Sequence, residues 1–279
     1  MMPSYLAWPL DPSVYAGLAA LLVGYLWLAQ GTHVRSRQRV WFAIGVAFIW
    51  LALETPLDTL GDTYLQSAHM TQHMLLMAFA PPFLLLGLNR PMVRRLHRVP
   101  GLRRITEPVP ALLLYTVAII GWHLPGPFDL ALANESLHVL EHLSFLACGV
   151  LFWWPMIKAT SAEARWSLSD PQKLVLLFFG SLPMMAVALP LQFAGYVFYA
   201  PYVHAPRINA FLTPVVDQTV AGAVMMFMDM SVMAADGLIV FFRWFNGEVN
   251  RDFARSEDPS QSVDSPEDQE ALEAYLSRH

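Results

Sequence analysis

The sequence has little charge and almost no cysteine. Only 14% of the 279 residues are charged and 56% are hydrophobic, whereas a soluble globular domain carries about 25% charged residues. The single cysteine, Cys148, excludes an intramolecular disulfide framework and a cysteine-rich metal site. The first residues lack a basic segment followed by a small-residue cleavage site, so we expect no cleaved signal peptide. This composition predicts a protein that resides in a lipid bilayer.

The negative net charge is concentrated at the C-terminal end. Residues 247–279 contain nine acidic residues and three arginines, whereas residues 1–246 contain thirteen acidic and fourteen basic residues. A near-neutral body gives no indication of nucleic-acid binding. We therefore expect a transmembrane domain over residues 1–246 and an acidic, largely disordered tail over residues 247–279. Within this tail, Ser265 and Pro266 predict the start of a short helix that ends near Ser277.

Seven apolar segments are close to or longer than the length of about 20 residues that a membrane-spanning helix needs. They are residues 13–30, 40–56, 66–88, 108–124, 136–157, 172–195 and 216–244. Two of these segments contain prolines that we expect to interrupt their helices, because proline lacks a backbone donor. These prolines are Pro81, Pro82, Pro183 and Pro190. The predicted fold is an all-α, polytopic bundle of seven transmembrane helices.

Basic residues fall almost entirely in alternate connecting segments. Sixteen of the seventeen lysines and arginines lie in residues 31–39, 89–107 and 158–173 or after residue 242, and the exception is Arg207. The positive-inside rule places these segments in the cytoplasm, so we expect the N-terminus outside and the C-terminus inside. The outer connections are acidic; they either raise the local cation concentration or form an ordinary solvated surface. Their acidic residues are Glu54, Asp58, Asp62, Asp129, Glu135 and Asp217.

Five histidines from three expected helices lie at one depth, near the outer side. His69 and His73 are spaced i, i+4 in the stretch HMTQHMLLM, and His138 and His142 have the same spacing in LHVLEHLSF. Each pair therefore lies along one face of its helix. His123 is expected at the outer end of the fourth span. Because polar groups in lipid are costly and tend to mark function, two facing pairs predict a metal site with four imidazoles.

Three methionines accompany the first histidine pair, namely Met70, Met74 and Met77. They are either soft ligands for a metal ion or ordinary apolar core residues. Cys148 lies deeper in the membrane than His138, and we expect it to be a core residue.

Two aspartates fall in the last expected span. Asp217 is close to its outer end, where a helix N-terminus favours an acidic side chain. Asp229 is close to the middle of the membrane, where an ionised carboxylate costs about 3 kcal/mol. Asp229 is therefore expected to be protonated, paired or turned towards a polar cavity.

The histidines are also compatible with other functions. HVLEH has the H-x-x-E-H spacing of inverzincin metallopeptidases, in which Glu141 would be the general base. Histidine pairs on two helices also suit bis-histidine haem ligation. A metal-free scaffold with structural histidines is a further alternative. Metal analysis and a Soret band distinguish these possibilities.

Longer stretches resemble one protein family. They are HMTQHMLLMAFAPPFLLLG, GWHLPGPFDLAL, LHVLEHLSFLACGVLFWWP, GSLPMMAVALPLQFAGYVFYAPY and DQTVAGAVMM. In this order, over about residues 60–230, they are similar to the polytopic CtaG-type assembly factors linked to caa-type cytochrome c oxidases. The sequence departs from the family after Met225, where MMFMDMSVM stands in place of Met-Trp and small residues. Asp229 is therefore not a feature that the family leads us to expect.

The resemblance implies a protein of the bacterial plasma membrane that is not an enzyme and helps a haem-copper oxidase to mature, through copper. Its implied partners are oxidase subunits, the lipid bilayer and a periplasmic copper donor. The family-like polar positions are His69, Gln72, His73, His123, His138, Glu141, His142, Asp217 and Gln218. We predict that the five histidines bind copper as Cu(I), with the three methionines as a softer border. We also predict that Glu141, Asp217 and Gln72 support the ligands through hydrogen bonds.

Overall fold

The computed structural model describes residues 4–256, 270 and 273–277, and the regular structure in these residues is helical throughout. The longer helices are α1 (Pro12–Ala29), α2 (Ser36–Leu53), α8 (Pro108–Trp122), α10 (Glu135–Trp153), α12 (Asp170–Phe193) and α14 (Pro214–Ser256). One further long segment, which we call the central helix, consists of α4 (Gln66–Met74), the π-helical turn η2 (Leu75–Phe79) and α5 (Ala80–Leu86). The shorter helices are η1 (Ser4–Leu6), α3 (Pro56–Thr63), α6 (Arg90–Leu96), α7 (Leu102–Ile105), α9 (Pro125–Ala133), α11 (Lys158–Ser161) and α13 (Ala200–His204).

The length and apolar character of these helices confirm the predicted fold class. Four of them, α1, α10, α12 and residues 214–250 of α14, are individually long and apolar enough to cross a bilayer. Three bent pairs reach this length together: α2 with α3 at 45°, the central helix with α6 at 118°, and α8 with α9 at 74°. The described residues therefore provide four to seven spans, and each of the seven predicted segments coincides with one of these helices.

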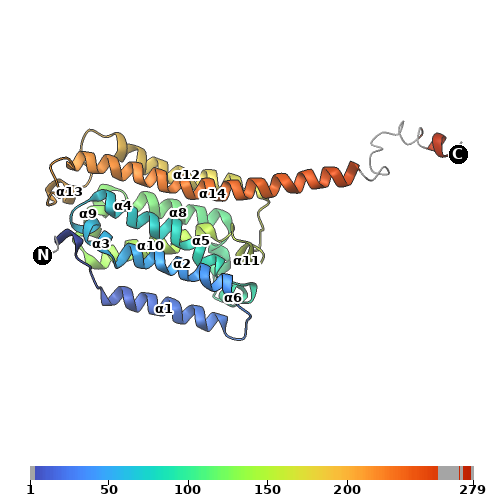
Figure 1. Ribbon diagram of the computed structural model, residues 1–279, viewed down its shortest axis with the longest axis horizontal. Helices are drawn as coiled ribbons and strands as arrows, with labels where there is room; N and C mark the ends of the chain where they lie inside the picture. The colour runs from blue at the N-terminus through green and yellow to red at the C-terminus, as the bar shows by residue number, and fades with distance from the viewer. Residues whose placement is uncertain (1–3, 257–269, 271–272, 278–279) are drawn as a thin grey trace.

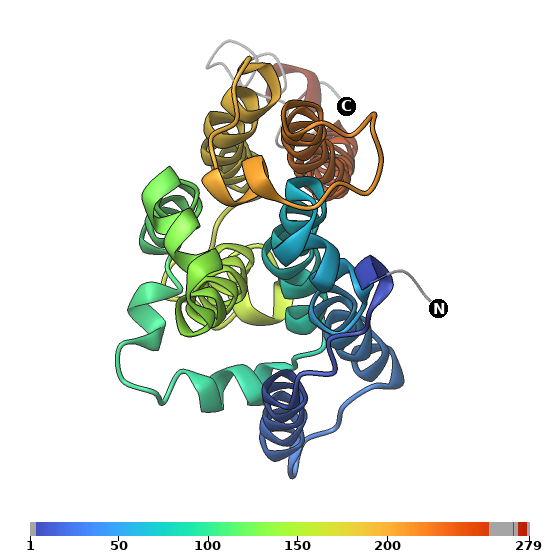
Figure 2. The same cartoon turned by 90° about the vertical axis from the view of Figure 1, so that its left-hand side faces the viewer.

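The central helix lies in the middle of the bundle (Figure 1, Figure 2). It packs against α2, α10 and α14. Helix α8 packs against α10 and α12, and α12 pairs along its length with α14. Helix α1 lies at the periphery, where it contacts α2 and α6. The segment with the first histidine pair is thus surrounded by the other helices rather than exposed to lipid.

Small residues let these helices approach closely. A Cβ atom on Gly222 of α14 would lie 2.5 Å from the carbonyl oxygen of Ala188 in α12. A Cβ atom on Gly149 of α10 would collide with the carbonyl group of Met77 in η2. Close backbone contact at small residues is a main source of helix association in membranes, where lipid tails provide no hydrophobic driving force. Gly222 therefore permits the close packing of α14 on α12, and Gly149 permits the close packing of α10 on the central helix.

The prolines interrupt one of their two helices. Pro81 and Pro82 begin α5 directly after the π-helical turn η2, which interrupts the α-helical hydrogen bonding of the central helix as predicted. Pro183 and Pro190 lie inside α12, which continues to Phe193, so this part of the prediction was wrong. Transmembrane helices tolerate proline because neighbouring groups can satisfy the carbonyls that lose their N–H donors.

The last helix extends beyond the boundary predicted at residues 246–247. Helix α14 continues to Ser256, so the first ten residues of the predicted tail are helical (Figure 1). Residues 273–276 are also helical, which agrees with the end of the predicted short helix. Its predicted start at Ser265 and Pro266 lies outside the described residues.

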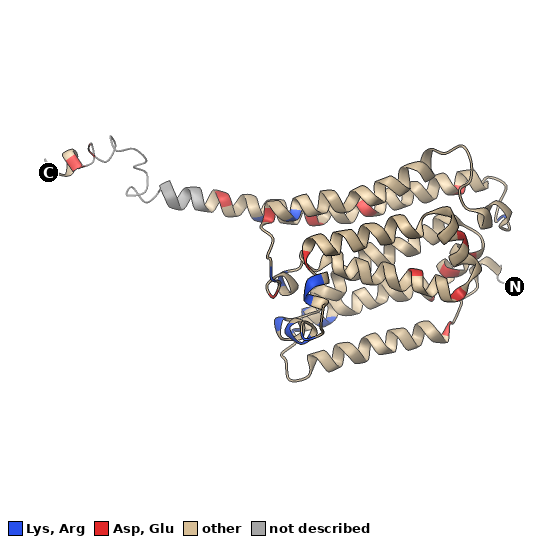
Figure 3. Cartoon of the chain, turned by 180° about the vertical axis from the view of Figure 1, so that it is seen from behind, with Lys and Arg blue, Asp and Glu red and all other residues tan. Residues whose placement is uncertain are grey.

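Charged side chains separate towards opposite ends of the bundle. Figure 3 shows lysine and arginine gathered around α6 and α11, whereas acidic residues gather at the other end, near α3. At the basic end, Arg95 donates to the carbonyl of Leu28 at 2.7 Å, and Arg94 pairs with Glu163 at 3.2 Å. The alternation along the sequence therefore corresponds to a separation in space.

Candidate metal centre

The five histidines predicted from the sequence come together at the acidic end of the bundle. His69 and His73 lie next to each other along α4 with their ring centroids 4.3 Å apart, and His138 and His142 do the same along α10 at 4.2 Å. Across the two helices, the centroids are 5.2 Å apart for His69 and His138 and 5.5 Å apart for His73 and His142. His123, at the end of α8, lies 5.4 Å from His73. The i, i+4 pairs thus face each other.

Two overlapping groups within this cluster have the geometry of a metal site. One ligand atom each from His69, His73 and His142 lie within 4.8 Å of one another. The same holds for Asp62, His69 and His138. The Asp62 carboxylate lies 3.5 Å from Nδ1 of His69 and 3.6 Å from Nδ1 of His138. Asp62 was noted in the sequence only as one of several outer acids, because nothing local ties α3 to the histidines.

The imidazole nitrogens of the cluster are buried and lack hydrogen-bond partners. This applies to both nitrogens of His69 and His73 and to Nε2 of His138 and His142. His69 and His73 are fully buried. An unpartnered polar atom away from water is costly, so buried polar atoms are normally satisfied by protein, water or an ion. A convergent set of unpaired imidazole nitrogens fits a site for a metal ion.

Glu141 lies within the cluster, one residue before His142. Its Oε1 is 3.7 Å from Nε2 of His73, both side chains are fully buried, and neither carboxylate oxygen accepts a hydrogen bond. The carboxylate is close enough to orient His73 or to share its ion after a small movement. The hydrogen bond predicted between Glu141 and a ligand is not formed at this distance, so the supporting role of Glu141 stays a prediction.

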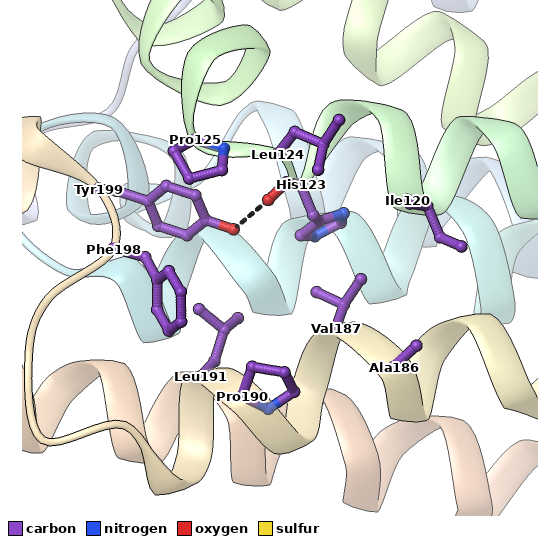
Figure 4. Close-up of a pocket in the computed structure, with 10 residues that line it drawn as sticks. All are labelled: Ile120, His123, Leu124, Pro125, Ala186, Val187, Pro190, Leu191, Phe198 and Tyr199. Atoms are coloured by element: carbon purple, nitrogen blue, oxygen red, sulfur yellow. Dashed lines mark hydrogen bonds between the residues drawn. The ribbon is translucent and has the colours of Figure 1, made fainter.

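His123 stands at the edge of the cluster. Its Nδ1 lies 2.8 Å from the carbonyl oxygen of Ile119, so Nδ1 carries the proton and donates. Nε2 is unpartnered. His123 belongs to neither of the two ligand groups, and its ring also lines a separate pocket (Figure 4).

Asp217 has a different contact from the one predicted. Its carboxylate accepts from the backbone N–H groups of Gln66 and Ser67 at 2.6 and 3.3 Å, and from the Ser67 hydroxyl at 2.5 Å. These groups form the first turn of α4, whose own N-cap residue, Leu65, offers no side-chain acceptor. Asp217 therefore caps the helix that carries His69 and does not support an imidazole directly.

Gln72 also supports the scaffold rather than a ligand. It donates to Asp58 Oδ1 at 2.9 Å and so ties α4 to α3. Gln218 performs a similar role on α14, because it donates to the carbonyl of Tyr196 at 2.8 Å and accepts from the N–H of Phe198 at 2.7 Å. The predicted supports thus position helices and loops around the site.

Aromatic side chains that sequence reasoning did not single out enclose the cluster. Phe145 lies 4.5 Å from His73, and Phe128 lies 5.2 Å from His69, measured between ring centroids. Tyr199 stacks on Phe128 at 3.8 Å. Phe145 is four residues after Glu141 on the same face of α10, so helical spacing was the signal that could have found it. The aromatic wall keeps the polar cluster away from lipid.

The methionines are fully buried in the apolar core. Whether the sulfurs of Met70, Met74 and Met77 bind a metal ion stays a prediction. Cys148 packs against the core, as expected. Asp229 is 2% exposed and its Oδ1 lacks a hydrogen-bond partner, so the expectation that this carboxyl is protonated, paired or turned towards a polar cavity stays a prediction.

The fold and cluster together define a membrane helix bundle with a buried histidine site. A family model described as cytochrome c oxidase caa3 assembly factor matches residues 19–247 of the chain. The chain therefore belongs to this family, and it is a multi-pass membrane protein with a role in the assembly of cytochrome c oxidase. Comparisons with curated proteins and with solved structures gave no match.

Proposed function

We propose that this protein holds copper in the histidine cluster and supports its insertion into cytochrome c oxidase. The observation that carries the proposal is the convergence of His69, His73 and His142, whose ligand atoms lie within 4.8 Å of one another and lack other partners. Copper is the cargo here, held for transfer.

The chemistry of the donors favours copper over harder ions. Imidazole nitrogen is a good copper ligand, and a thioether selects Cu(I). Within the described residues the only cysteine, Cys148, is outside both ligand groups. A site without thiolate exchanges its ion more readily than a closed cysteine site, as transfer to another protein requires.

We also propose that the cluster faces the outside of a bacterial plasma membrane. It lies beside Asp62 of α3, at the end of the bundle opposite the basic residues around α6 and α11 (Figure 3), and the positive-inside rule assigns the basic end to the cytoplasm. A copper donor would then deliver from the periplasm, and oxidase subunits would receive the ion within or beside the membrane.

Copper content of the purified protein tests the site. We expect bound copper in the wild type, measured by mass spectrometry after desalting, and none in the double variant His73→Ala/His142→Ala. A matched control is His204→Ala, because His204 is exposed on α13 and outside the cluster. Full copper occupancy in the double variant would show that the histidines are structural.

The same sample distinguishes the alternative functions. A Soret band indicates haem ligation. Zinc in place of copper, together with peptide hydrolysis that Glu141→Gln abolishes, indicates the metallopeptidase alternative.

Deletion of the gene tests the role in assembly. We expect the oxidase polypeptides to remain in the membrane with low copper and low activity, and excess copper in the medium to restore part of the activity. The wild-type gene should restore activity, and the double histidine variant should not. Full oxidase activity in a deletion strain without related proteins would contradict the proposal.

A further inference from the structure

A large pocket opens at the basic end of the bundle. It has a volume of about 700 Å³ and lies between the start of α2, the end of α5 and the starts of α6 and α11. Ligand sites typically have volumes of about 300–1,000 Å³. Figure 3 shows lysine and arginine gathered around α6 and α11 in this part of the molecule. The pocket is therefore separate from the histidine cluster, which lies beside α3.

Four basic side chains line this pocket, namely Arg35, Arg37, Arg90 and Lys158. All four residues are exposed, so a ligand can reach their charged ends. The described lining contains no aspartate or glutamate, and none of the four forms an ion pair with a carboxylate of the described residues. Four unpaired positive charges around one cavity attract an anion.

Two amide side chains hold the pocket together. Gln38 donates to the carbonyl of Leu88 at 2.7 Å and accepts from the N–H of Arg35 at 3.1 Å. Asn89 donates to the carbonyl of His33 at 3.3 Å. These bonds fix the segment before α2 against the end of the central helix, so the shape of the pocket does not depend on a ligand.

One wall of the pocket is apolar and continues as a row of aromatic rings between α2 and the central helix. The row begins at Trp41, whose ring centroid lies 5.6 Å from the guanidinium carbon of Arg37. Ring centroids are 5.5 Å apart for Trp41 and Phe83, 5.5 Å for Phe83 and Phe48, and 5.6 Å for Phe48 and Phe79. All four rings belong to half-buried residues. Such a surface suits an acyl chain and contributes nothing to the binding of a dissolved anion.

We propose that this pocket binds the phosphate group of an anionic phospholipid, whose acyl chain lies along the aromatic row. Arginine and lysine are the usual partners of phosphate groups, and basic pockets between transmembrane helices suit anionic headgroups. A zwitterionic lipid such as phosphatidylcholine brings its own cation to the four positive side chains, so the pocket prefers a lipid with net negative charge. The proposal does not depend on copper, because no residue of the pocket belongs to the two groups of metal-ligating atoms.

Two phospholipids with the same acyl chains test the inference on the purified, full-length protein in detergent. Phosphatidylglycerol or phosphatidylcholine is added, and native mass spectrometry measures the fraction of protein with one bound lipid. Since each basic side chain near an anionic lipid changes the affinity about fivefold, we expect phosphatidylglycerol to bind about 5- to 25-fold more tightly. Equal affinity for the two lipids would overturn the proposal.

Two double variants with the same loss of charge locate the binding. Arg37→Gln/Lys158→Gln removes two cations from the pocket and should abolish the preference for phosphatidylglycerol. Arg98→Gln/Arg104→Gln is the control and should retain the preference, because both arginines are exposed in the basic segment 89–107 but lie outside the pocket. Equal losses in the two variants would show a diffuse attraction to the basic surface and refute the assignment.

Glycerol phosphate distinguishes a lipid from a soluble phosphate compound, because it has the phosphate group but no acyl chain. We expect it to displace phosphatidylglycerol only weakly. Leu86→Gln keeps the four cations but makes the lining more polar at a residue that is 37% exposed, so it should weaken the binding of phosphatidylglycerol and leave that of glycerol phosphate unchanged. If glycerol phosphate binds as tightly as phosphatidylglycerol, the pocket is a site for soluble phosphate compounds and the lipid assignment is wrong.

Discussion

Asp62 connects the two histidine pairs through a single carboxylate. It reaches Nδ1 of His69 from one oxygen and Nδ1 of His138 from the other. At 3.5 and 3.6 Å these contacts are longer than hydrogen bonds, but a shift of a few tenths of an ångström would let the carboxylate accept from Nδ1–H, and a carboxylate in that position orients an imidazole and strengthens it as a ligand. The acidic side chain placed to orient both histidine pairs is therefore Asp62 of the short helix α3.

Removal of this support should weaken copper binding without abolishing it. We expect Asp62→Asn and Glu141→Gln each to lower the copper affinity about 10- to 100-fold, because the imidazoles remain but lose an orienting carboxylate. Competition with a chelator of known affinity measures the change. Glu135→Gln is a matched control, since Glu135 is an exposed acid at the start of α10. Equal affinities for Asp62→Asn and Glu135→Gln would contradict this role.

For single residues, the sequence predicts well which side chains are neighbours on the same helix. The i, i+4 spacing was sufficient to place His69 beside His73 and His138 beside His142. It could not reveal Asp62, because the contact joins separate elements and depends on the bend between α2 and α3.

Among the elements, α4 depends on a cap supplied by another helix. The Asp217 carboxylate of α14 accepts hydrogen bonds from the first turn of α4, 150 residues away in the sequence. Loss of a helix cap costs about 0.5–2 kcal/mol. The helix that carries His69 and His73 is thus held at its N-terminal end by the last helix of the bundle.

Asp217→Ala should therefore destabilise the protein more than it weakens the site. We expect a lower midpoint of thermal unfolding in detergent, with copper stoichiometry retained at low temperature. Asp217→Asn, which keeps one acceptor, should lie between the wild type and Asp217→Ala. Loss of copper from a fully stable Asp217→Ala variant would point instead to direct participation in the site.

The α12–α14 pair should be sensitive to a single methyl group. Gly222→Ala places a carbon 2.5 Å from the Ala188 carbonyl, and such overpacking costs about 1–3 kcal/mol. Gly121→Ala in α8 is the matched control, because a Cβ atom there has no neighbour within 4 Å. We expect thermal unfolding to shift downwards for Gly222→Ala only. Equal shifts for the two variants would show that the contact is not a tight one.

Helix positions were predicted well because apolar length is a direct physical requirement of the bilayer. The effect of Pro183 and Pro190 was predicted wrongly, because α12 continues through both residues. The sequence shows that two backbone N–H donors are missing, but it does not show how the surrounding structure accommodates the freed carbonyls. The long continuation of α14 past residue 246 was missed because a polar segment carries no apolar signal.

For the whole molecule, the separation of charge predicts an orientation in the membrane. The histidine cluster contacts Asp62 of α3 at the acidic end, and α6 and α11 lie at the basic end (Figure 3). Basic segments are retained on the cytoplasmic side during insertion. The molecule is therefore expected to present the cluster to the outside and its basic loops to the cytoplasm.

Reporter fusions check this orientation. A reporter after Ala210, between α13 and α14, should report the periplasm, whereas reporters after Pro100 and at the C-terminus should report the cytoplasm. At each position two separate fusions are made, one with a reporter that is active only in the periplasm and one with a reporter that is active only in the cytoplasm. The two results at one position should be opposite, which is the control. If the fusions after residue 210 and at residue 279 report the same side of the membrane, the seven-span topology is wrong.

The length of α14 has a mechanical consequence. Its 43 residues span about 65 Å at about 1.5 Å per residue, roughly twice the 30 Å of the hydrocarbon core. Figure 1 shows the C-terminal end of this helix continuing beyond the ends of the other helices. Its contact with α12 continues as far as Arg243, which pairs with Asp170 at the start of α12, so only the turns after Arg243 project. Because these turns continue the same helix, a tilt of α14 within the bundle would be enlarged at Ser256.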